Sequence, residues 1–431
     1  MRYIYSATIA VFILTNTSCK HTRNSTMSMP RSTTVLCHYM PWFERSITNG
    51  KTNYEHWKWG GENPHNPDNS IYGNLRDIAS VYYPRIGVYD SSDADVLDYH
   101  ILTAKAAGID AFVVDWHKPH DAVDRNMNIL FERAEKLNFK VMVCYEEKAC
   151  FPHWNQITQR EEAVKKAVSD FRYLADKYFS RSNYWKKNEK PCVIVFSSWG
   201  EAGGIGKKVF TPGEWDTILA AAPDIYLGRQ NFDTNYTSSR SAFAWDGDKA
   251  YSDWYYVEGD NLVKSGKLDF YIGSALPGFD DRGVWGWGDG PRFTANMGLD
   301  TFSRYWDAFE ASACDVMQIV TWNDFEEGTV IEPTVQFGNL YLDNAEERIS
   351  QIRGTEPKTA DNSLPYNWFV LRKFAPETFK SQLDTARSLL ANGKTEEAEK
   401  LLDIIQTKSK TNIPTYLDMN HEYPAKETNK R

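Results

Sequence analysis

The 431-residue sequence lacks the excess of positive charge that a nucleic-acid-binding protein needs. It has 49 Lys and Arg residues against 58 Asp and Glu residues, which gives a formal net charge of -9. Binding to phosphate backbones rests on clustered Lys and Arg, so nucleic acid is excluded as a partner. The sequence also lacks any long biased tract, and 42% hydrophobic with 25% charged residues is typical of a folded globular chain.

The N-terminus lacks an apolar run long enough to cross a bilayer. Arg2 precedes a short apolar stretch from Ile4 to Leu14, and small polar residues then lead to Cys19. This order is typical of an export signal. Cys19 and the polar residues after it resemble a bacterial lipoprotein junction, although Asn16 stands where such signals prefer Leu. We therefore expect lipidation of Cys19 and a membrane-anchored lipoprotein that faces the periplasm or the cell surface.

Few cysteines remain, and their spacing matches no zinc pattern. An odd number cannot pair completely, and a buried free cysteine packs as a small hydrophobe. We therefore expect structural roles, no bound metal and no cofactor. The residues concerned are Cys37, Cys144, Cys150, Cys192 and Cys314.

Short β-branched runs alternate with helical patterns along most of the chain, which predicts a parallel sheet. Nearly continuous hydrophobicity implies burial on both strand faces, so we predict an α/β fold, a closed (β/α)8 TIM barrel. Helices are expected over 93–107, 122–137, 161–178, 212–222 and 296–313. Strands are expected over 33–40, 110–116, 140–146, 191–197, 224–228, 269–275 and 316–322, with a weaker one over 249–256.

Four segments follow from this pattern. They are a signal peptide at 1–19, a flexible linker at 20–33, the catalytic barrel at 34–372, and a C-terminal helical hairpin with a tail at 373–431. The hairpin helices join at Asn392–Lys394 and are expected to dock on the barrel. Two insertions, 43–92 and the Gly/Trp-rich 277–293, follow strand ends and should wall a substrate cleft.

Polar and aromatic residues gather where the predicted strands end, which is where barrel enzymes carry their active sites. Flat aromatic faces can stack on sugar rings, although they can also fill the barrel mouth, and Glu146 can either bind sugar or pair with Lys148. A metal at His117 and His120 is disfavoured, because neighbouring polar groups at strand ends usually form hydrogen bonds. The candidate substrate-binding residues are Tyr39, Trp42, Asp115, Trp116, Tyr145, Glu146, Trp199, Trp322 and Asn323.

The segment after the last predicted strand carries the candidate catalytic residues, Asp324 and Glu327. Glycoside hydrolysis needs two carboxyl groups around the scissile bond. Their three-residue spacing allows one tight turn to point both inward, and Gly328 permits close backbone approach. Burial beside Trp322 and Phe325 should raise the pKa of one carboxyl and keep it protonated.

Several motifs together resemble glycoside hydrolase family 99, the endo-α-mannosidases and endo-α-1,2-mannanases. The longest is the run 82–93, which leads into Val96, His100 and 107–110. The resemblance spans roughly residues 34 to 335. Its other parts are His38-Tyr39, Pro41-Trp42, Asp115-Trp116, 277–281 and 323–332.

The resemblance implies a metal-independent endo-acting enzyme that cleaves α-mannosidic linkages, with Glu327 as general acid and Asp324 as base. In family 99 the base position is Glu, and its proposed role is to deprotonate the substrate's 2-hydroxyl. Here the residue is Asp, as in the related family 71 of inverting α-1,3-glucanases. Because a shorter side chain can admit a water molecule, the stereochemistry and the sugar stay open.

Two further functions use the same residues. A glycan-binding surface protein that lost catalysis would keep the barrel, although the presence of both carboxylates disfavours it. Glycosyl transfer to an acceptor sugar would differ from hydrolysis only in its products. In every case the expected partners are a polysaccharide or oligosaccharide and a lipid anchor, and the chain is expected to act as a monomer.

Overall fold

The computed structural model describes residues 30–150, 160–197, 210–221, 224–232, 235–245, 247, 249–295, 298–357, 362–418 and 420–427. Cys19 and the predicted signal peptide lie outside these residues, as does Trp199. Within the described ranges, no helix combines the length and the apolar character that crossing a bilayer requires.

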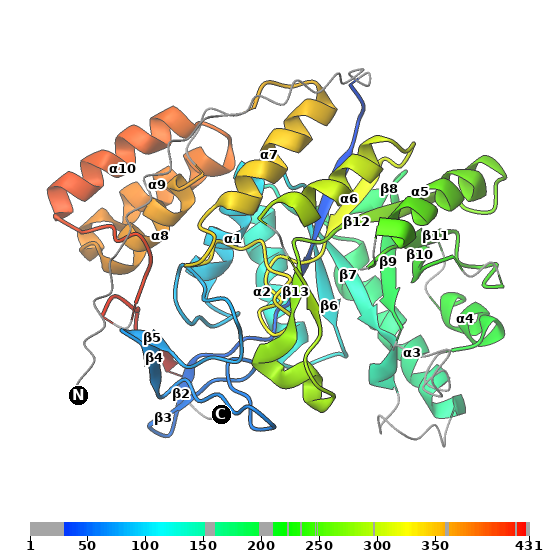
Figure 1. The fold of residues 1–431 in the computed structure, drawn as a ribbon, viewed down its shortest axis with the longest axis horizontal. Helices are drawn as coiled ribbons and strands as arrows, with labels where there is room; N and C mark the ends of the chain where they lie inside the picture. Colours follow the sequence, from blue (N-terminus) through cyan, green and yellow to red (C-terminus); the bar gives the residue numbers. More distant parts are fainter. Residues whose placement is uncertain are drawn as a thin grey trace, which may run out of the picture.

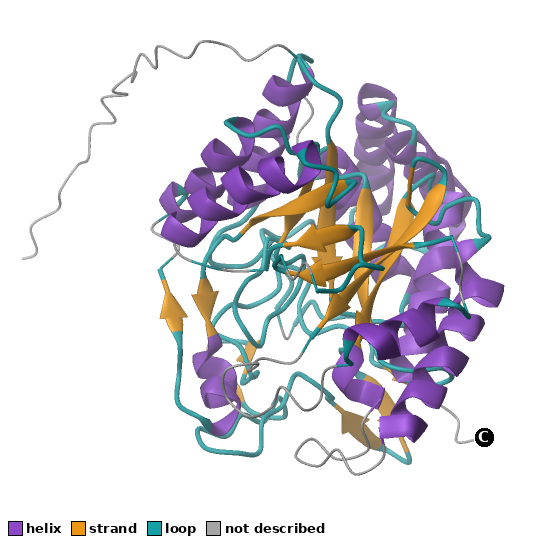
Figure 2. Ribbon diagram, turned by 90° about the vertical axis from the view of Figure 1, so that its right-hand side faces the viewer, coloured by secondary structure: helices purple, strands orange, loops and turns teal. Residues whose placement is uncertain are grey.

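A closed parallel barrel forms the centre of the molecule, which confirms the predicted fold. Its ring closes because β10 pairs with β9 as well as with β11. Helices surround the strands, and long loops gather at one end (Figures 1 and 2). In ring order the strands are β1 (Thr34–Tyr39), β6 (Ala111–Trp116), β7 (Lys140–Glu146), β9 (Lys190–Phe196), β10 (Tyr226–Gln230), β11 (Ser241–Phe243), β12 (Phe270–Ala275) and β15 (Val316–Ile319).

The predicted strand over 249–256 is wrong, because these residues begin helix α5 (Lys249–Lys264). Its buried residues include Ser252, Tyr255, Tyr256 and Gly259, which follow the spacing of one helix face. Their aromatic richness imitates a strand. The sixth barrel strand is instead the short β11, which pairs with β10 and β12.

The other helices lie within a few residues of their predicted positions. Asp93 caps the first by accepting a hydrogen bond from the Asp95 amide, and Asp121 caps the second in the same way through Asp124. The barrel helices are α1 (Ala94–Ala106), α2 (Ala122–Lys136), α3 (Arg160–Leu174) with the π turn η2 (Ala175–Phe179), α4 (Pro212–Leu219), α5, α6 (Asp300–Glu310) and α7 (Leu340–Arg353).

Three C-terminal helices pack together beside α1 (Figure 1). The helices α9 (Lys380–Ala391) and α10 (Thr395–Ser409) form the predicted hairpin. The hairpin rests on α8 (Leu364–Phe374), where the Trp368 indole donates to the Leu383 carbonyl at 2.9 Å, and Arg387 reaches Asp98 on α1 at 3.0 Å. The helix α8 crosses residue 372, where the sequence places the end of the barrel segment.

The insertion 43–92 lies across the barrel end and is tied down by the C-terminal tail. Glu422 accepts from Arg45 at 3.2 Å and from Arg76 at 2.8 Å. The remaining short elements are β2 (Ser46–Thr48), β3 (Lys51–Asn53), β4 (Ser70–Tyr72), β5 (Leu75–Arg76), β8 (Lys186–Lys187), β13 (Phe279–Asp280), β14 (Phe293–Thr294), β16 (Lys426–Glu427) and the 3-10 turns η1 (Glu147–Cys150), η4 (Asp281–Gly288) and η5 (Glu377–Phe379).

Candidate active site

Three carboxyl groups meet inside the barrel mouth at the carboxyl ends of the strands. Asp115 is the next-to-last residue of β6, Glu146 ends β7, and Asp324 follows β15; each is buried. Burial raises the pKa of Asp115 well above its usual value, and the nearby charges of Glu146 and Asp324 raise it further. The mouth therefore favours the protonated form of Asp115.

Lys148 partly offsets this charge. Its Nζ lies 3.4 Å from Glu146 Oε2. Burial alone would lower the pKa of Lys148, but the attraction of Glu146 and Asp115 raises it, so the ammonium stays charged. The two alternatives for Glu146 are thus compatible, because it both pairs with Lys148 and lies in the mouth.

The turn after β15 places Asp324 and Glu327 side by side. The Asp324 amide donates to Thr321 Oγ1 at 2.8 Å, and the Glu327 amide donates to Asp324 Oδ1 at 2.9 Å. Gly328 has φ +63°, and a Cβ there would approach the Asp280 carbonyl oxygen to 2.7 Å. A side chain at 328 would push the turn away from the neighbouring loop, so the glycine keeps the pair in position.

The two members of the pair lie in different environments. Asp324 is buried, and burial, followed by the charges of Glu327 and Glu326, raises its pKa well above the usual value. The Glu327 side chain is 20% exposed, its Oε1 accepts from the Trp287 indole at 3.3 Å, and Arg292 lies 3.6 Å away. The pKa of Asp324, the residue that the resemblance makes the base, is therefore raised.

A buried hydrogen-bond network holds this turn from behind. Asn323 accepts from the Met40 amide at 2.8 Å and donates to the Tyr89 hydroxyl at 3.0 Å. Tyr89 in turn donates to Glu332 at 2.9 Å, and Glu332 lies 3.4 Å from His100. Tyr89 and His100 belong to the motif that carries the family resemblance, so that motif supports the turn.

Several residues predicted to bind substrate lie on the outer side of the strands, where they are fully buried. Tyr39 bonds to His100 at 3.0 Å, Trp116 donates to Asp124 at 3.1 Å, and Tyr145 donates to Asp170 at 3.0 Å. Trp322 packs against His100 and Phe112. Because these four side chains pack against helix residues and outward-facing strand residues, the structure does not bring them to the cleft. Asn323 is also buried, and its amide bonds to Met40 and Tyr89.

Trp42 does lie at the mouth, where it is partly buried. Its ring stacks on His56 with centroids 4.9 Å apart and on His117 at 6.0 Å. His56 Nδ1 lies 2.9 Å from Glu326 Oε2, so Glu326 pairs with His56. Burial lowers the pKa of His117, so its imidazole is neutral.

Sequence reasoning missed the floor of the mouth. His38 lies beside Gln318, its ring meets Trp245 edge to face at 4.6 Å, and burial lowers its pKa to about 3. Within the described part of the chain, His38 Nδ1, Asp115 Oδ1 and both amide atoms of Gln318 have no hydrogen-bond partner. Gln318 is the one polar residue of β15, and a polar side chain inside an apolar strand is the signal that could have identified this floor.

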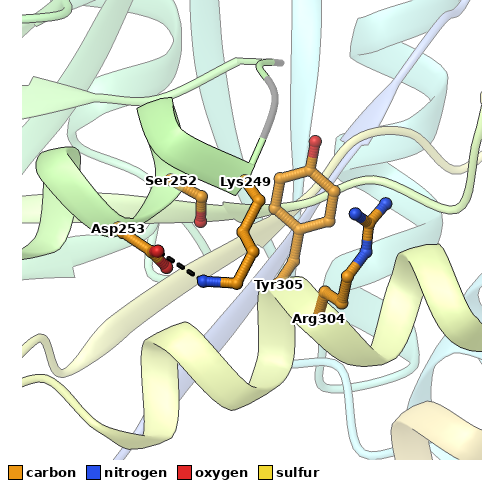
Figure 3. A pocket seen from close by; sticks show the side chains of 5 residues that line it. All are labelled: Lys249, Ser252, Asp253, Arg304 and Tyr305. Carbon is orange, nitrogen blue, oxygen red and sulfur yellow. Dashed lines mark hydrogen bonds and ion pairs between the residues drawn. The ribbon is translucent and has the colours of Figure 1, made fainter.

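In the described ranges, no three His, Cys, Asp or Glu side chains are placed to hold a metal ion. The five described cysteines are buried and free. A small hollow between α5 and α6 lies on the outside of the barrel, where Lys249 pairs with Asp253 next to Tyr305 and Arg304 (Figure 3). It is separate from the carboxyl pair.

A closed parallel barrel with a carboxyl pair at its carboxyl end is the arrangement of a glycoside hydrolase. A family model described as glycosyl hydrolase family 71 matches residues 79–385. The chain therefore belongs to glycosyl hydrolase family 71, and it is an enzyme that hydrolyses glycosidic bonds.

Curated relatives and a solved structure agree with this class. The chain is 22% identical to mouse glycoprotein endo-alpha-1,2-mannosidase over 347 residues, which is 71% of this chain and 69% of the relative. The rat protein of the same name is 22% identical over 352 residues, 72% of this chain and 70% of the relative. The GH99 endo-alpha-mannosidase from Bacteroides thetaiotaomicron shares the fold, with a TM-score of 0.58, 18% identity, and coverage of 74% of this chain and 97% of that chain.

Proposed function

We propose that this chain is an endo-acting glycoside hydrolase that cleaves α-mannosidic linkages in mannan or related glycans without a metal. The observation that carries the proposal is the pairing of Asp324 and Glu327 in one turn with unlike environments. Two carboxyl groups whose surroundings differ can divide acid and base work between them. The endo-mannosidase names of the relatives support the substrate class.

Glu327 is the proposed general acid. It is the more exposed member of the pair, so it can reach the glycosidic oxygen of a bound chain and protonate the leaving sugar. Asp324 is the proposed base. Burial raises its pKa, and a carboxylate with a raised pKa, once ionised, accepts a proton more readily.

Two routes remain for the base. Asp324 can deprotonate the substrate's 2-hydroxyl, whose oxygen then attacks the anomeric carbon, giving a 1,2-anhydro sugar that water opens with retention. It can instead deprotonate a water that attacks directly with inversion. The anomeric configuration of the first product separates the two routes.

The substrate class is tested by proton NMR of an α-mannan digest. The proposal predicts short oligosaccharides with new mannose reducing ends, because an endo-acting enzyme cuts internal bonds. Release of single sugars from the chain end, or no cleavage of any α-mannan, would contradict it.

A second candidate is hydrolysis of α-1,3-glucan. The match to the family 71 model and the Asp at position 324 favour it. A parallel digest of α-1,3-glucan decides between the two, because the preferred polymer is the one shortened at the lower enzyme concentration.

The proposed location is a membrane, facing the periplasm or the cell surface, reached through an export signal and lipidation of Cys19. The order of residues before and after Cys19 supports this. We expect the full chain to incorporate labelled palmitate and to partition into detergent, and Cys19→Ser to abolish both. Incorporation by the variant equal to that of the wild type would contradict the anchor.

A further inference from the structure

Two tryptophans from different insertions meet at the rim of the active site. Trp59 and Trp287 lie edge to face, with ring centroids 5.8 Å apart and an angle of 85° between the rings. Trp287 is 43% exposed, and its indole N–H donates to Glu327 Oε1 at 3.3 Å. An exposed aromatic corner thus adjoins the proposed acid directly.

The backbone that carries Trp287 has a fixed and unusual conformation. Trp285, Gly286 and Trp287 all lie in the left-handed region, with φ of 48°, 63° and 59°. That region is costly for residues with side chains, and such conformations persist where surrounding contacts fix them.

These contacts come from both insertions. Asp281 is fully buried and accepts from the Arg292 side chain at 2.7 Å. Gly283 packs so closely that a Cβ there would lie 2.6 Å from the Ala79 carbonyl carbon. Asn63 donates to the Arg282 carbonyl at 3.2 Å. The loop that carries Trp287 is therefore clamped to the insertion that carries Trp59.

Exposure increases outward from the barrel axis. Asp324 is 3% exposed, the Glu327 side chain 20%, and Trp287 43%. A sugar chain bound in the mouth therefore extends from the buried carboxylates past Glu327 to the tryptophans. Because the general acid protonates the leaving oxygen, the sugar beyond Glu327 is the leaving group.

We propose that Trp59 and Trp287 form the leaving-group platform, a subsite that takes the apolar face of a neutral hexopyranose on the departing side of the cut. This inference rests on the proposed function, since it uses Glu327 as the acid. The platform selects substrates that carry at least one sugar beyond the scissile bond.

The test compares two substrates with the same sugar on the retained side. One is α-1,2-linked mannotetraose, and the other is α-mannobiosyl fluoride, whose leaving group carries no sugar and needs no proton. We expect Trp59→Ala and Trp287→Ala to raise KM for the tetraose about tenfold, the loss expected from roughly 50–60 Å² of apolar contact. Activity on the fluoride should stay within about twofold, and Trp287→Phe should restore most of the affinity for the tetraose.

The control is Trp254→Ala, which removes a similarly exposed tryptophan from the outer helix α5 and should change neither substrate. Equal losses on both substrates would overturn the platform, because a subsite on the departing side cannot act on the fluoride, which has no sugar there. A lower kcat for the tetraose with an unchanged KM would also overturn it, because the tryptophans would then act by supporting Glu327. An unchanged KM for the tetraose in both alanine variants would overturn it as well.

A binding measurement separates this proposal from the proposed function. Calorimetry in the Glu327→Gln background should show that Trp59→Ala and Trp287→Ala each weaken mannotetraose binding about tenfold, whether or not the wild type hydrolyses it. Failure of the proposed function would be an intact chain that cuts no α-mannan. Failure of the platform would be mannotetraose affinity that does not depend on either tryptophan.

Discussion

Glu146 and Tyr145 are consecutive residues of β7, yet they point to opposite sides of the barrel wall. Glu146 lies inside with Asp115 and Lys148. Tyr145 lies outside, where its hydroxyl is used by Cys150 and Asp170. The same contrast separates Asp115 from Trp116 and His38 from Tyr39. Inward residues at the strand ends have polar atoms that face the mouth and can bind a ligand. Outward residues form hydrogen bonds within the scaffold.

The largest expected effect within this comparison comes from Asp324→Asn. Loss of the base should lower kcat about 10³-fold. In the wild type, folding favours the protonated form of the Asp324 carboxyl. Its contribution to stability is therefore present below its ordinary pKa of 3.8 and is lost as the pH rises through the raised value. The neutral amide should therefore raise the free energy of unfolding at pH 7 by about 1 kcal/mol.

Urea unfolding at pH 7 and pH 4 measures this prediction, and the difference between the two proteins should shrink at the lower pH. An active Asp324→Asn enzyme would contradict the catalytic role of the residues that face the inside of the barrel mouth. An equal difference between the two proteins at both pH values would contradict the raised pKa of Asp324.

A matched pair on β7 sharpens the comparison further. Glu146→Gln should lower kcat/KM about 50-fold, since a hydrogen bond to a charged group contributes about 1.5–3 kcal/mol, with little change in unfolding. Tyr145→Phe should leave kcat/KM unchanged and lower the free energy of unfolding by about 1 kcal/mol, because the Asp170 carboxylate loses a donor. If both variants lose activity equally, the distinction between the faces fails.

The smallest effect concerns His56 and Glu326 at the rim. Burial alone would lower the pKa of His56, but Glu326 raises it. Its contribution to stability is therefore complete below pH 6.5 and disappears as the pH rises through the raised value. Because the His56 side chain is 35% exposed, wild type should lose only about 0.5 kcal/mol more than His56→Gln between pH 6 and pH 9. Parallel pH dependences in urea unfolding would contradict the pairing.

The fold was predictable because seven of its strands lie in largely apolar runs that alternate with helical patterns. The sixth strand was not, because β11 has three residues and the aromatic segment after it imitates a strand. Pairing of the C-terminal tail with the insertion 43–92 through Glu422 also has no local signal, since it depends on residues more than 300 positions apart.

The catalytic turn was predictable from its motif. The side of the barrel wall to which each neighbouring strand residue points was not. Tyr39, Trp116 and Tyr145 share the chemistry of sugar-binding aromatics, and only the register of each strand places them outside. Trp287 was not among the predicted site residues. A run of residues in the left-handed backbone region points its side chain at Glu327, and the composition of the segment does not reveal such a run.

Two adjacent residues test the central claim most directly. Glu327→Gln and Glu326→Gln make the same chemical change one position apart, on a residue that adjoins Asp324 as its partner and on one that binds His56. We predict that α-mannan hydrolysis falls about 10³-fold in Glu327→Gln, while Glu326→Gln keeps most of its activity. Retained hydrolysis in a folded Glu327→Gln protein would contradict the account.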